Sequence, residues 1–233
     1  MNREKYVVIM AAGSGSRMGA ELPKQFLEID GKAILQKTIE VFRDALPGIK
    51  VITVLPEAYI DYWKDYCLKR NFICPQVLVK GGITRFHSVK NALERVPEGA
   101  LVAVHDGVRP LVTEKFLQNI FSVAENVTGV IPVLPCIDTM KVLKTENTVL
   151  KSVPGVEADR SVLYGAQTPQ IFQSELLKQA YEQPFSPTFT DDASVMEKNG
   201  KSLSYVIGER LNIKITTQED LILARAIYSI RKD

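Results

Sequence analysis

The sequence has few cysteines and no apolar run long enough to cross a bilayer. Its three cysteines, Cys67, Cys74 and Cys136, form no CxxC or other metal-ligand spacing, which excludes a disulfide framework and a zinc motif and predicts reduced thiols in a cytoplasmic protein. The opening residues MNREKYVVIMAAG lack the apolar stretch and cleavage site of a signal peptide. Since a span needs about 20 apolar residues, no membrane association is expected.

A strong excess of charge of either sign is also missing. The 233 residues include 29 Lys+Arg and 27 Asp+Glu, which gives a formal net charge of +2, and neither end carries a basic arm. Binding to nucleic acid through a phosphate-neutralising field is therefore not expected. With 45% hydrophobic residues and no composition shift or repeat, the chain is expected to form one domain over residues 1–233.

Short apolar runs alternate with helix-like segments through the first part of the chain. The runs are nearly continuous in hydrophobicity, which is typical of strands buried on both faces of a parallel sheet. They are Tyr6–Met10, Val51–Leu55, Gln76–Val79, Leu101–Val104 and Gly129–Leu134, and the helix-like segments are Ala33–Ala45, Glu57–Arg70, Arg85–Arg95 and Thr113–Ala124. The alternation predicts an α/β fold with a doubly wound, mostly parallel sheet that binds ligands outside the carboxyl ends of its strands.

The pattern changes over residues 136–160. Two short alternating stretches, MKVLK and VLKSV, flank the residues TENT, which predicts two antiparallel strands joined by a tight turn. Pro154 and the polar exterior make this segment unsuitable for the centre of a sheet. The pattern leaves two alternatives open: an ordinary exposed hairpin, or a protruding β-hairpin arm that grips a second subunit.

The C-terminal third returns to mixed structure. Helices are expected over Ser174–Tyr181 and Asp191–Asn199, and a short strand over Leu203–Val206. A long amphipathic helix is expected over Thr217–Arg231, because Thr217 is a good N-cap and Asp220 supplies a carboxylate to the first turn. This last helix is interpreted as structural.

A glycine-rich stretch, Ala11–Gly19, follows the first predicted strand directly. Small residues at this position let the backbone turn sharply and present N–H groups to a phosphate. A dinucleotide-binding GxGxxG would need glycine where Met18 stands, and a P-loop would need Gly-Lys-Ser/Thr where the chain has Arg17-Met18. Neither motif is present, so nicotinamide chemistry and P-loop chemistry are both disfavoured.

Two cations accompany this turn, Arg17 within it and Lys24 in the following LPKQ stretch. Fixed cations beside a phosphate cradle stabilise the charge that develops during phosphoryl or nucleotidyl transfer. Each cation taken alone is more simply read as a solvated surface charge. The neighbouring glycines favour the catalytic interpretation.

Taken in order, the motifs resemble a known family. The opening AAGSGSRM and LPKQF resemble sugar-nucleotide pyrophosphorylases and cytidylyltransferases. The later motifs are Gly81-Gly82 with Arg85 and Ser88-Val89, HDGVRP at 105–110, DTMK at 138–141, QTPQ at 167–170, TDD at 190–192 and NIK at 212–214. Together they resemble the 2-C-methyl-D-erythritol 4-phosphate cytidylyltransferases of the non-mevalonate isoprenoid pathway. The ribitol-5-phosphate cytidylyltransferases share most of these motifs.

The resemblance implies a reaction and an architecture. It implies that CTP and a sugar-alcohol phosphate are joined, with Mg²⁺, into a CDP-alcohol and pyrophosphate. It also implies a nucleotide-diphospho-sugar transferase-like fold whose arm exchanges with a partner to form a homodimer.

The resemblance further implies roles for individual residues. Arg17 and Lys24 would be catalytic, acting on the α-phosphate; the CTP-binding residues would be Ala11, Ala12, Gly13, Gly15, Gly82 and Ser88. The sugar-alcohol phosphate would be bound by Arg109, Thr139, Arg160, Thr168, Thr190 and Lys214. Because Arg160 ends the arm, it is expected to serve the neighbouring subunit. Ile83 departs from the acidic or polar residue of relatives, so only a main-chain contact to the base is expected there.

Four acidic or histidine positions allow competing interpretations. Asp106 follows a buried strand, and a hard carboxylate there suits Mg²⁺. His105 is interpreted as a packed, hydrogen-bonded residue rather than a general base, because the attacking phosphate is already ionised. Asp191 and Asp192 are interpreted as the charged start of a capped helix rather than a second metal site.

Two alternative functions remain at this point. A ribitol-5-phosphate cytidylyltransferase would use the same cleft and chemistry, although AAGSGSRM and the ADR…GAQTPQ stretch favour methylerythritol phosphate. A non-catalytic nucleotide-binding regulator is a different class. The joint presence of Arg17, Lys24, Asp106 and Lys214 argues against it.

Overall fold

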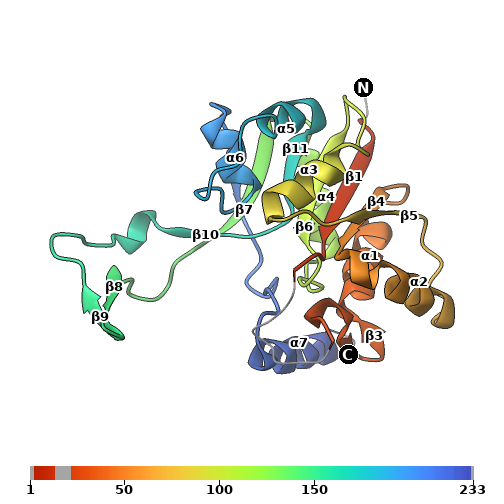
Figure 1. Cartoon of the computed structure of the whole chain (residues 1–233), viewed down its shortest axis with the longest axis horizontal. Helices are drawn as coiled ribbons and strands as arrows, with labels where there is room; N and C mark the ends of the chain where they lie inside the picture. Colours follow the sequence, from red (N-terminus) through yellow and green to blue (C-terminus); the bar gives the residue numbers. More distant parts are fainter. Residues whose placement is uncertain (1–2, 14–21, 232–233) are drawn as a thin grey trace.

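The central element is one eight-stranded sheet (Figure 1). The structure, a computed structural model, describes residues 3–13 and 22–231. The strands are β1 (Lys5–Met10), β4 (Lys50–Leu55), β5 (Gln76–Lys80), β6 (Leu101–Asp106), β7 (Gly129–Pro135), β10 (Tyr164–Ala166), β11 (Gln170–Gln173) and β12 (Ser204–Ile207). Their order is β10-β7-β11-β6-β1-β4-β5, with β12 paired to β7. The sequence prediction of a mostly parallel sheet in an α/β fold is confirmed.

Two strands of this sheet carry no recognisable signal in the sequence. β11 runs antiparallel between β6 and β7, and β10 continues antiparallel along β7. Their sequences, YGA and QIFQ, contain too few apolar residues to form a run, and Pro169 separates them. Tertiary pairing with two long buried strands, rather than local pattern, makes these residues extended.

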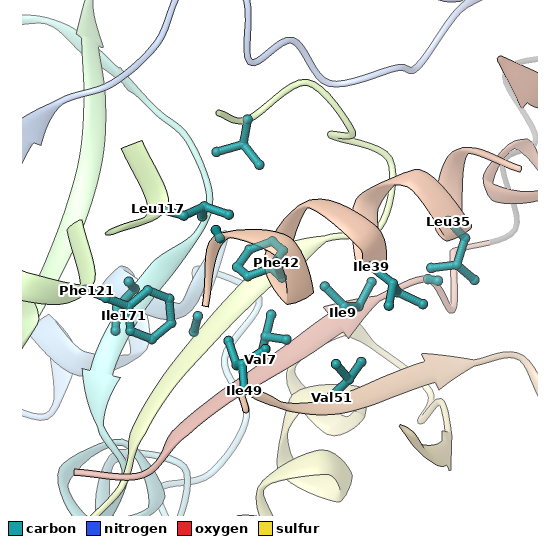
Figure 2. Close-up of a cluster of buried hydrophobic side chains, with 14 of the residues drawn as sticks. Val7, Ile9, Leu35, Ile39, Phe42, Ile49, Val51, Leu117, Phe121 and Ile171 are labelled. Carbon is teal, nitrogen blue, oxygen red and sulfur yellow. The ribbon is translucent and has the colours of Figure 1, made fainter. Parts of the chain in front are cut away.

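Helices cover both faces of the sheet because its central strands alternate between two cores. Val7 and Ile9 of β1 point to one core and Val8 points to the other. The first core lies under α1 (Ile34–Ala45), α2 (Ile60–Lys69) and α4 (Glu114–Ala124). The second lies under α3 (Arg85–Leu93), α5 (Ser174–Ala180) and α6 (Asp192–Lys198). Figure 2 shows the first core, with side chains from α1 packed over those of β1.

The predicted helices are present with small shifts at their ends. Residues 57–70 divide into a 3₁₀ turn, η3 (Glu57–Tyr59), and α2, which begins at Ile60. The last helix, α7 (Gln218–Ile230), starts with the expected capping box between Thr217 and Asp220. It packs on a third core beside the small hairpin of β2 (Glu28–Ile29) and β3 (Lys32–Ala33).

The predicted hairpin is also present. β8 (Leu143–Glu146) and β9 (Val149–Ser152) pair antiparallel and extend away from the central sheet (Figure 1). Asn147 and Thr148 between them both have positive φ, 48° and 68°, as a two-residue hairpin turn requires. A 3₁₀ turn, η4 (Arg160–Val162), leads back toward the sheet.

Within residues 3–13 and 22–231, every helix is too short or too polar to span a bilayer.

Candidate active site

A buried glutamine fixes the turn after β1 through hydrogen bonds to its backbone. Gln25, only 1% exposed, donates through Nε2 to the carbonyl oxygens of Ala11 (2.7 Å) and Gly13 (3.4 Å). Gln25 lies in η2 (Lys24–Phe26), so the same 3₁₀ turn that fixes the backbone also carries Lys24. Gly15 and Arg17, the other predicted residues of this turn, lie outside the described residues.

A second glycine turn follows β5. An added Cβ at Gly82 would lie 2.5 Å from the His87 Cβ, and one at Gly81 would lie 2.6 Å from the Ala12 Cβ, so both positions need glycine. The Gly82 N–H donates to Ser88 Oγ (2.9 Å), and that hydroxyl donates to the Thr84 carbonyl (2.9 Å). Ser88 is therefore not a surface hydroxyl: it fixes the turn against the start of α3.

These two turns line one cleft of about 540 Å³ at the carboxyl edge of the parallel strands. Met10 ends β1 and Asp106 ends β6, and the two residues are register partners, so the turn and the carboxylate lie side by side. The polar lining of the cleft includes Lys24, Gln25, Thr84, Arg85, Ser88, Asp106, Lys214 and Thr216. Ile83 also lines it, with 95% of its surface exposed.

Asp106 is the carboxylate around which the cations of the cleft gather. Its Oδ2 lies 3.1 Å from both Arg109 Nε and Lys214 Nζ. Burial alone would raise the pKa of the Asp106 carboxyl, but Lys214, Arg85 and Arg109 together hold that pKa well below its usual range. Asp106 is therefore ionised at every physiological pH.

A hydrogen-bonded chain behind Asp106 fixes one tautomer of His105. The Asp106 N–H donates to Thr168 Oγ1 (3.1 Å), which also lies 3.1 Å from His105 Nδ1. His105 Nε2 lies 3.1 Å from the Arg109 carbonyl, which can only accept, so Nε2 carries the proton and Nδ1 accepts from Thr168. Burial lowers the pKa of His105 to about 4. A neutral, packed His105 agrees with the sequence interpretation.

The predicted site residues divide into three sets. Ala11, Ala12, Gly13, Lys24, Gly82, Ser88, Asp106 and Lys214 line the cleft directly. Arg109 and Thr168 lie behind it, in contact with Asp106. Thr139 and Arg160 lie on the exposed arm, where Arg160 donates to the Ile137 carbonyl (3.0 Å), and Thr190 is exposed ahead of α6. Neither the arm residues nor Thr190 line the cleft of their own chain.

Gln25 and Arg85 are among the cleft residues that received no role from the sequence. Gln25 was visible only as part of LPKQF. Arg85, in the second glycine motif, pairs with fully buried Asp192 (Nη2 to Oδ2, 2.6 Å), whose Oδ1 accepts from the Tyr181 hydroxyl (2.6 Å). Asp191 caps α6 in a capping box with Ser194, as the capped-helix interpretation requires. Its neighbour Asp192 instead holds Arg85 at the cleft.

The described residues offer a magnesium ion a limited set of ligands. They contain no cluster of three histidine, cysteine or acidic side chains suited to a metal. Among the described residues that line the cleft, Asp106 is the one carboxylate, and both of its ion pairs use Oδ2. Mg²⁺ is commonly held by one or two carboxylates together with substrate phosphates and waters. The donor set therefore suits Mg²⁺ when a phosphate-bearing substrate supplies the other ligands.

Comparisons with known proteins agree with the geometry. The family model described as IspD, 2-C-methyl-D-erythritol 4-phosphate cytidylyltransferase, matches residues 6–229. Proteins of that name from Bacteroides thetaiotaomicron and Azobacteroides pseudotrichonymphae are 44% and 45% identical, over 95% and 97% of this chain and 98% and 99% of their own. The crystal structure of 4-diphosphocytidyl-2C-methyl-D-erythritol synthase from Anaerococcus prevotii is 29% identical with a TM-score of 0.77, covering 97% of this chain and 99% of that one.

Proposed function

The chain belongs to the 2-C-methyl-D-erythritol 4-phosphate cytidylyltransferase family, and from that premise we propose how its own residues perform the reaction. It is a CTP-dependent nucleotidyltransferase that joins CTP and 2-C-methyl-D-erythritol 4-phosphate into 4-diphosphocytidyl-2-C-methyl-D-erythritol and pyrophosphate. The observation that carries the assignment of roles is the single cleft in which two glycine turns, two lysines and one ionised carboxylate converge.

The two glycine turns are the proposed CTP site. The backbone of Ala12 and Gly13 approaches the phosphates, because their small side chains let a phosphate come close. The Ala11 N–H donates to the Val54 carbonyl (2.9 Å), so Ala11 closes the turn after β1 instead of donating to a phosphate. The cytosine ring lies against Gly82 and Ser88 at the second turn. Since the Ser88 hydroxyl already bridges Gly82 and Thr84, base recognition there depends on a preformed turn.

The proposed chemistry is an in-line displacement at the α-phosphorus of CTP. A phosphate oxygen of the sugar alcohol attacks, the bond to the β-phosphate oxygen breaks, and pyrophosphate leaves. Lys24, with Arg17, stabilises the negative charge that builds on the equatorial oxygens. No general base is needed because the attacking phosphate is already ionised, which matches a neutral, buried His105.

Asp106 is the proposed magnesium ligand. When bound, Mg²⁺ would supply neutralisation of phosphate charge and fix the phosphates in position. Lys214, which pairs with Asp106 at the cleft wall, is proposed to contact the incoming phosphate as well. Arg109 pairs with Asp106 from behind the cleft and is proposed to act through that carboxylate. Thr190 is proposed to contribute a hydroxyl contact to the sugar alcohol. The Thr168 hydroxyl accepts from the Asp106 N–H and donates to His105 Nδ1, so its proposed role is to fix Asp106 from behind the cleft.

A Lys24→Met enzyme tests the proposed charge stabilisation. We expect kcat to fall about 10²-fold, because the lost contact strengthens in the transition state, while the Kd for CTP changes far less. Steady-state kinetics and calorimetry measure the two quantities. Lys69→Met, which removes an exposed lysine of α2, is the matched control. An unchanged kcat in Lys24→Met would remove Lys24 from this role.

We propose that the arm forms a homodimer. Its apolar side chains are unusually exposed for an isolated chain: Ile137 is 64% exposed, Val149 57% and Leu150 65%. Exposed apolar side chains that follow one another along a protruding element are typical of an interface. Thr139 and Arg160 lie on this same arm, so a partner's cleft is the place where they would meet substrate.

Mixed dimers test the shared site. When Arg160→Ala and Lys24→Ala chains are randomly recombined, half of the dimers are hybrids, and each hybrid has one site with both residues intact. We expect recovery to about a quarter of wild-type activity. Recombined Lys24→Ala and Lys214→Ala chains are the control, because both residues belong to the same cleft and no hybrid restores it. Recovery no greater than in this control would contradict a shared site.

Substrate choice is tested by pyrophosphate release from CTP and Mg²⁺ with each of two acceptors. Release with 2-C-methyl-D-erythritol 4-phosphate alone is expected. Release with ribitol 5-phosphate alone would preserve the cleft and its chemistry but move the enzyme to polyol-phosphate metabolism. CTP binding without turnover on either acceptor would support a nucleotide-binding regulator.

We propose that the enzyme works in the cytoplasm. Its three cysteines are all free thiols in the structure. Burial raises the pKa of the Cys67 thiol to about 11, so this group is poorly reactive toward oxidants. Unpaired thiols are usual in a reducing compartment.

A further inference from the structure

A second pocket lies on the α7 side of α1, apart from the active-site cleft. It has a volume of about 470 Å³ and is formed by α1, the start of α4, the end of α7 and the segment Pro110–Thr113. It shares no lining residue with the nucleotide cleft. No role in the proposed reaction falls on the residues that line it.

The pocket contains a buried lysine whose ammonium lacks a hydrogen-bond acceptor. Lys37 is 4% exposed, and within residues 3–13 and 22–231 its Nζ has no hydrogen-bond partner. The Tyr228 ring covers one side of the ammonium, with its centroid 3.6 Å from Nζ. An ammonium carries three N–H donors, and burying a charge without acceptors is costly. The Lys37 Nζ is itself buried at the pocket wall, so an anionic group that enters beside it would supply the acceptor that this ammonium lacks.

The N-terminus of α4 faces the same pocket. Thr113 caps this 11-residue helix, and its Oγ1 and carbonyl accept from Phe116 N–H and Leu117 N–H. The N–H groups of Glu114 and Lys115 precede any intrahelical partner and find no acceptor among the described residues. Both residues line the pocket. The Glu209 carboxylate already accepts from the Thr113 N–H (2.9 Å) and the Thr113 hydroxyl (2.5 Å) at this helix start. The Glu114 and Lys115 N–H groups are the donors left for a second anion at the positive end of the helix dipole.

The remaining lining limits the charge and shape of the ligand. Lys115 and Arg231 add positive charge, whereas Glu40, Asp44 and Glu114 add carboxylates at the pocket wall. Glu40 is already engaged by Lys32 (2.9 and 3.0 Å). The rest of the wall is apolar and includes Val41, Leu111, Val112 and the Tyr228 ring. Such a lining disfavours a polyphosphate and suits one small anionic group on an apolar body.

We propose that this pocket binds a small organic oxyanion, a monophosphate or carboxylate on a compact apolar body, between the Lys37 ammonium and the N-terminus of α4. The anionic head takes the donors of Lys37 and the free N–H groups of Glu114 and Lys115. The apolar body lies against Val112 and Tyr228. The proposal is independent of the reaction assigned to the other cleft.

Amide-resolved NMR titration of the intact protein tests it, with phenyl phosphate and benzoate as two probes that separate a phosphate head from a carboxylate head. We expect saturable shifts of the Glu114 and Lys115 amides with at least one probe. Benzyl alcohol, which lacks the anionic head, is expected to leave these amides unshifted. Shifts confined to Gly13 and Gly82 would show binding in the nucleotide cleft only and would overturn the proposal.

Lys37→Met tests the role of the ammonium while keeping most of the side-chain volume. We expect at least about a tenfold loss of affinity for the better probe, and no loss in Lys69→Met, the control of equal charge on α2. If Lys37→Met does not fold, the wild-type shifts still decide whether the pocket binds an oxyanion. Unchanged affinity in a folded Lys37→Met protein would overturn the proposal.

Discussion

An Asp106→Asn enzyme is expected to lose about 10³-fold in kcat. Asparagine keeps the size of the side chain and a hydrogen-bonding oxygen but removes the charge. Arg109 and Lys214, which both contact Asp106 Oδ2, would then lose the anion that holds them in place. The same change removes the one carboxylate among the described residues of the cleft. The reacting phosphates would therefore be positioned less accurately, and their charge would be neutralised less well.

Asp61→Asn is the matched control for this result. Asp61 has a side chain that is 92% exposed and pairs with Lys64 on the surface of α2. It does not line the cleft. Its substitution is expected to leave kcat unchanged, since exposed pairs contribute little. Thermal melts followed by circular dichroism establish that both variants are folded. A folded Asp106→Asn enzyme with nearly full kcat would exclude Asp106 from the reaction.

Stability is expected to fall as the solution is acidified from pH 6.5 to pH 4, with His105 contributing about 3 kcal/mol of the loss. The pKa of His105 is lowered from 6.5 to about 4 in the folded protein, mainly by burial. Between these values the unfolded chain binds a proton at this position and the folded chain does not. Stability from His105 is therefore complete above pH 6.5 and decreases toward pH 4.

The hydrogen-bonded chain opposes protonation of His105 in addition to burial. Protonation would add an N–H at His105 Nδ1, where the neutral ring accepts from the Thr168 hydroxyl. That hydroxyl oxygen already accepts from the Asp106 N–H. Urea unfolding across the pH range measures the loss. In a His105→Gln variant, which has no titrating group at this position, the free energy of unfolding should fall by about 3 kcal/mol less between pH 6.5 and pH 4. Direct NMR titration of the imidazole gives an independent check. A His105 pKa near 6.5 in the folded protein would contradict the account.

The fold was predictable where the hydrophobic pattern of a single segment was enough to identify it as a strand. YVVIM and LVAV are buried on both faces, so hydrophobicity alone identified β1 and β6. β11 could not be found in this way, because QIFQ becomes a strand only between β6 and β7. The hairpin of β8 and β9 was found because alternation and a tight turn are both local features.

The site was predictable to the extent that it lies at strand ends. Because β1 and β6 are parallel neighbours, the turn at Ala11 and the carboxylate of Asp106 had to meet at one edge of the sheet. The approach of Lys214 to that carboxylate and the pairing of Arg85 with Asp192 could not be read from local pattern, since both pairs join residues more than a hundred positions apart. The family resemblance supplied Lys214, whereas the role of Asp192 came from the structure.

The central claim is that CTP reacts in the cleft between the two glycine turns. A crystal structure of the protein with a non-hydrolysable CTP analogue and Mn²⁺ in place of Mg²⁺ tests it most directly. We predict the α-phosphate beside Lys24, the cytosine ring at Gly82 and Ser88, and an anomalous Mn²⁺ peak next to the Asp106 carboxylate. A nucleotide bound elsewhere, or Mn²⁺ without a contact to Asp106, would contradict the account.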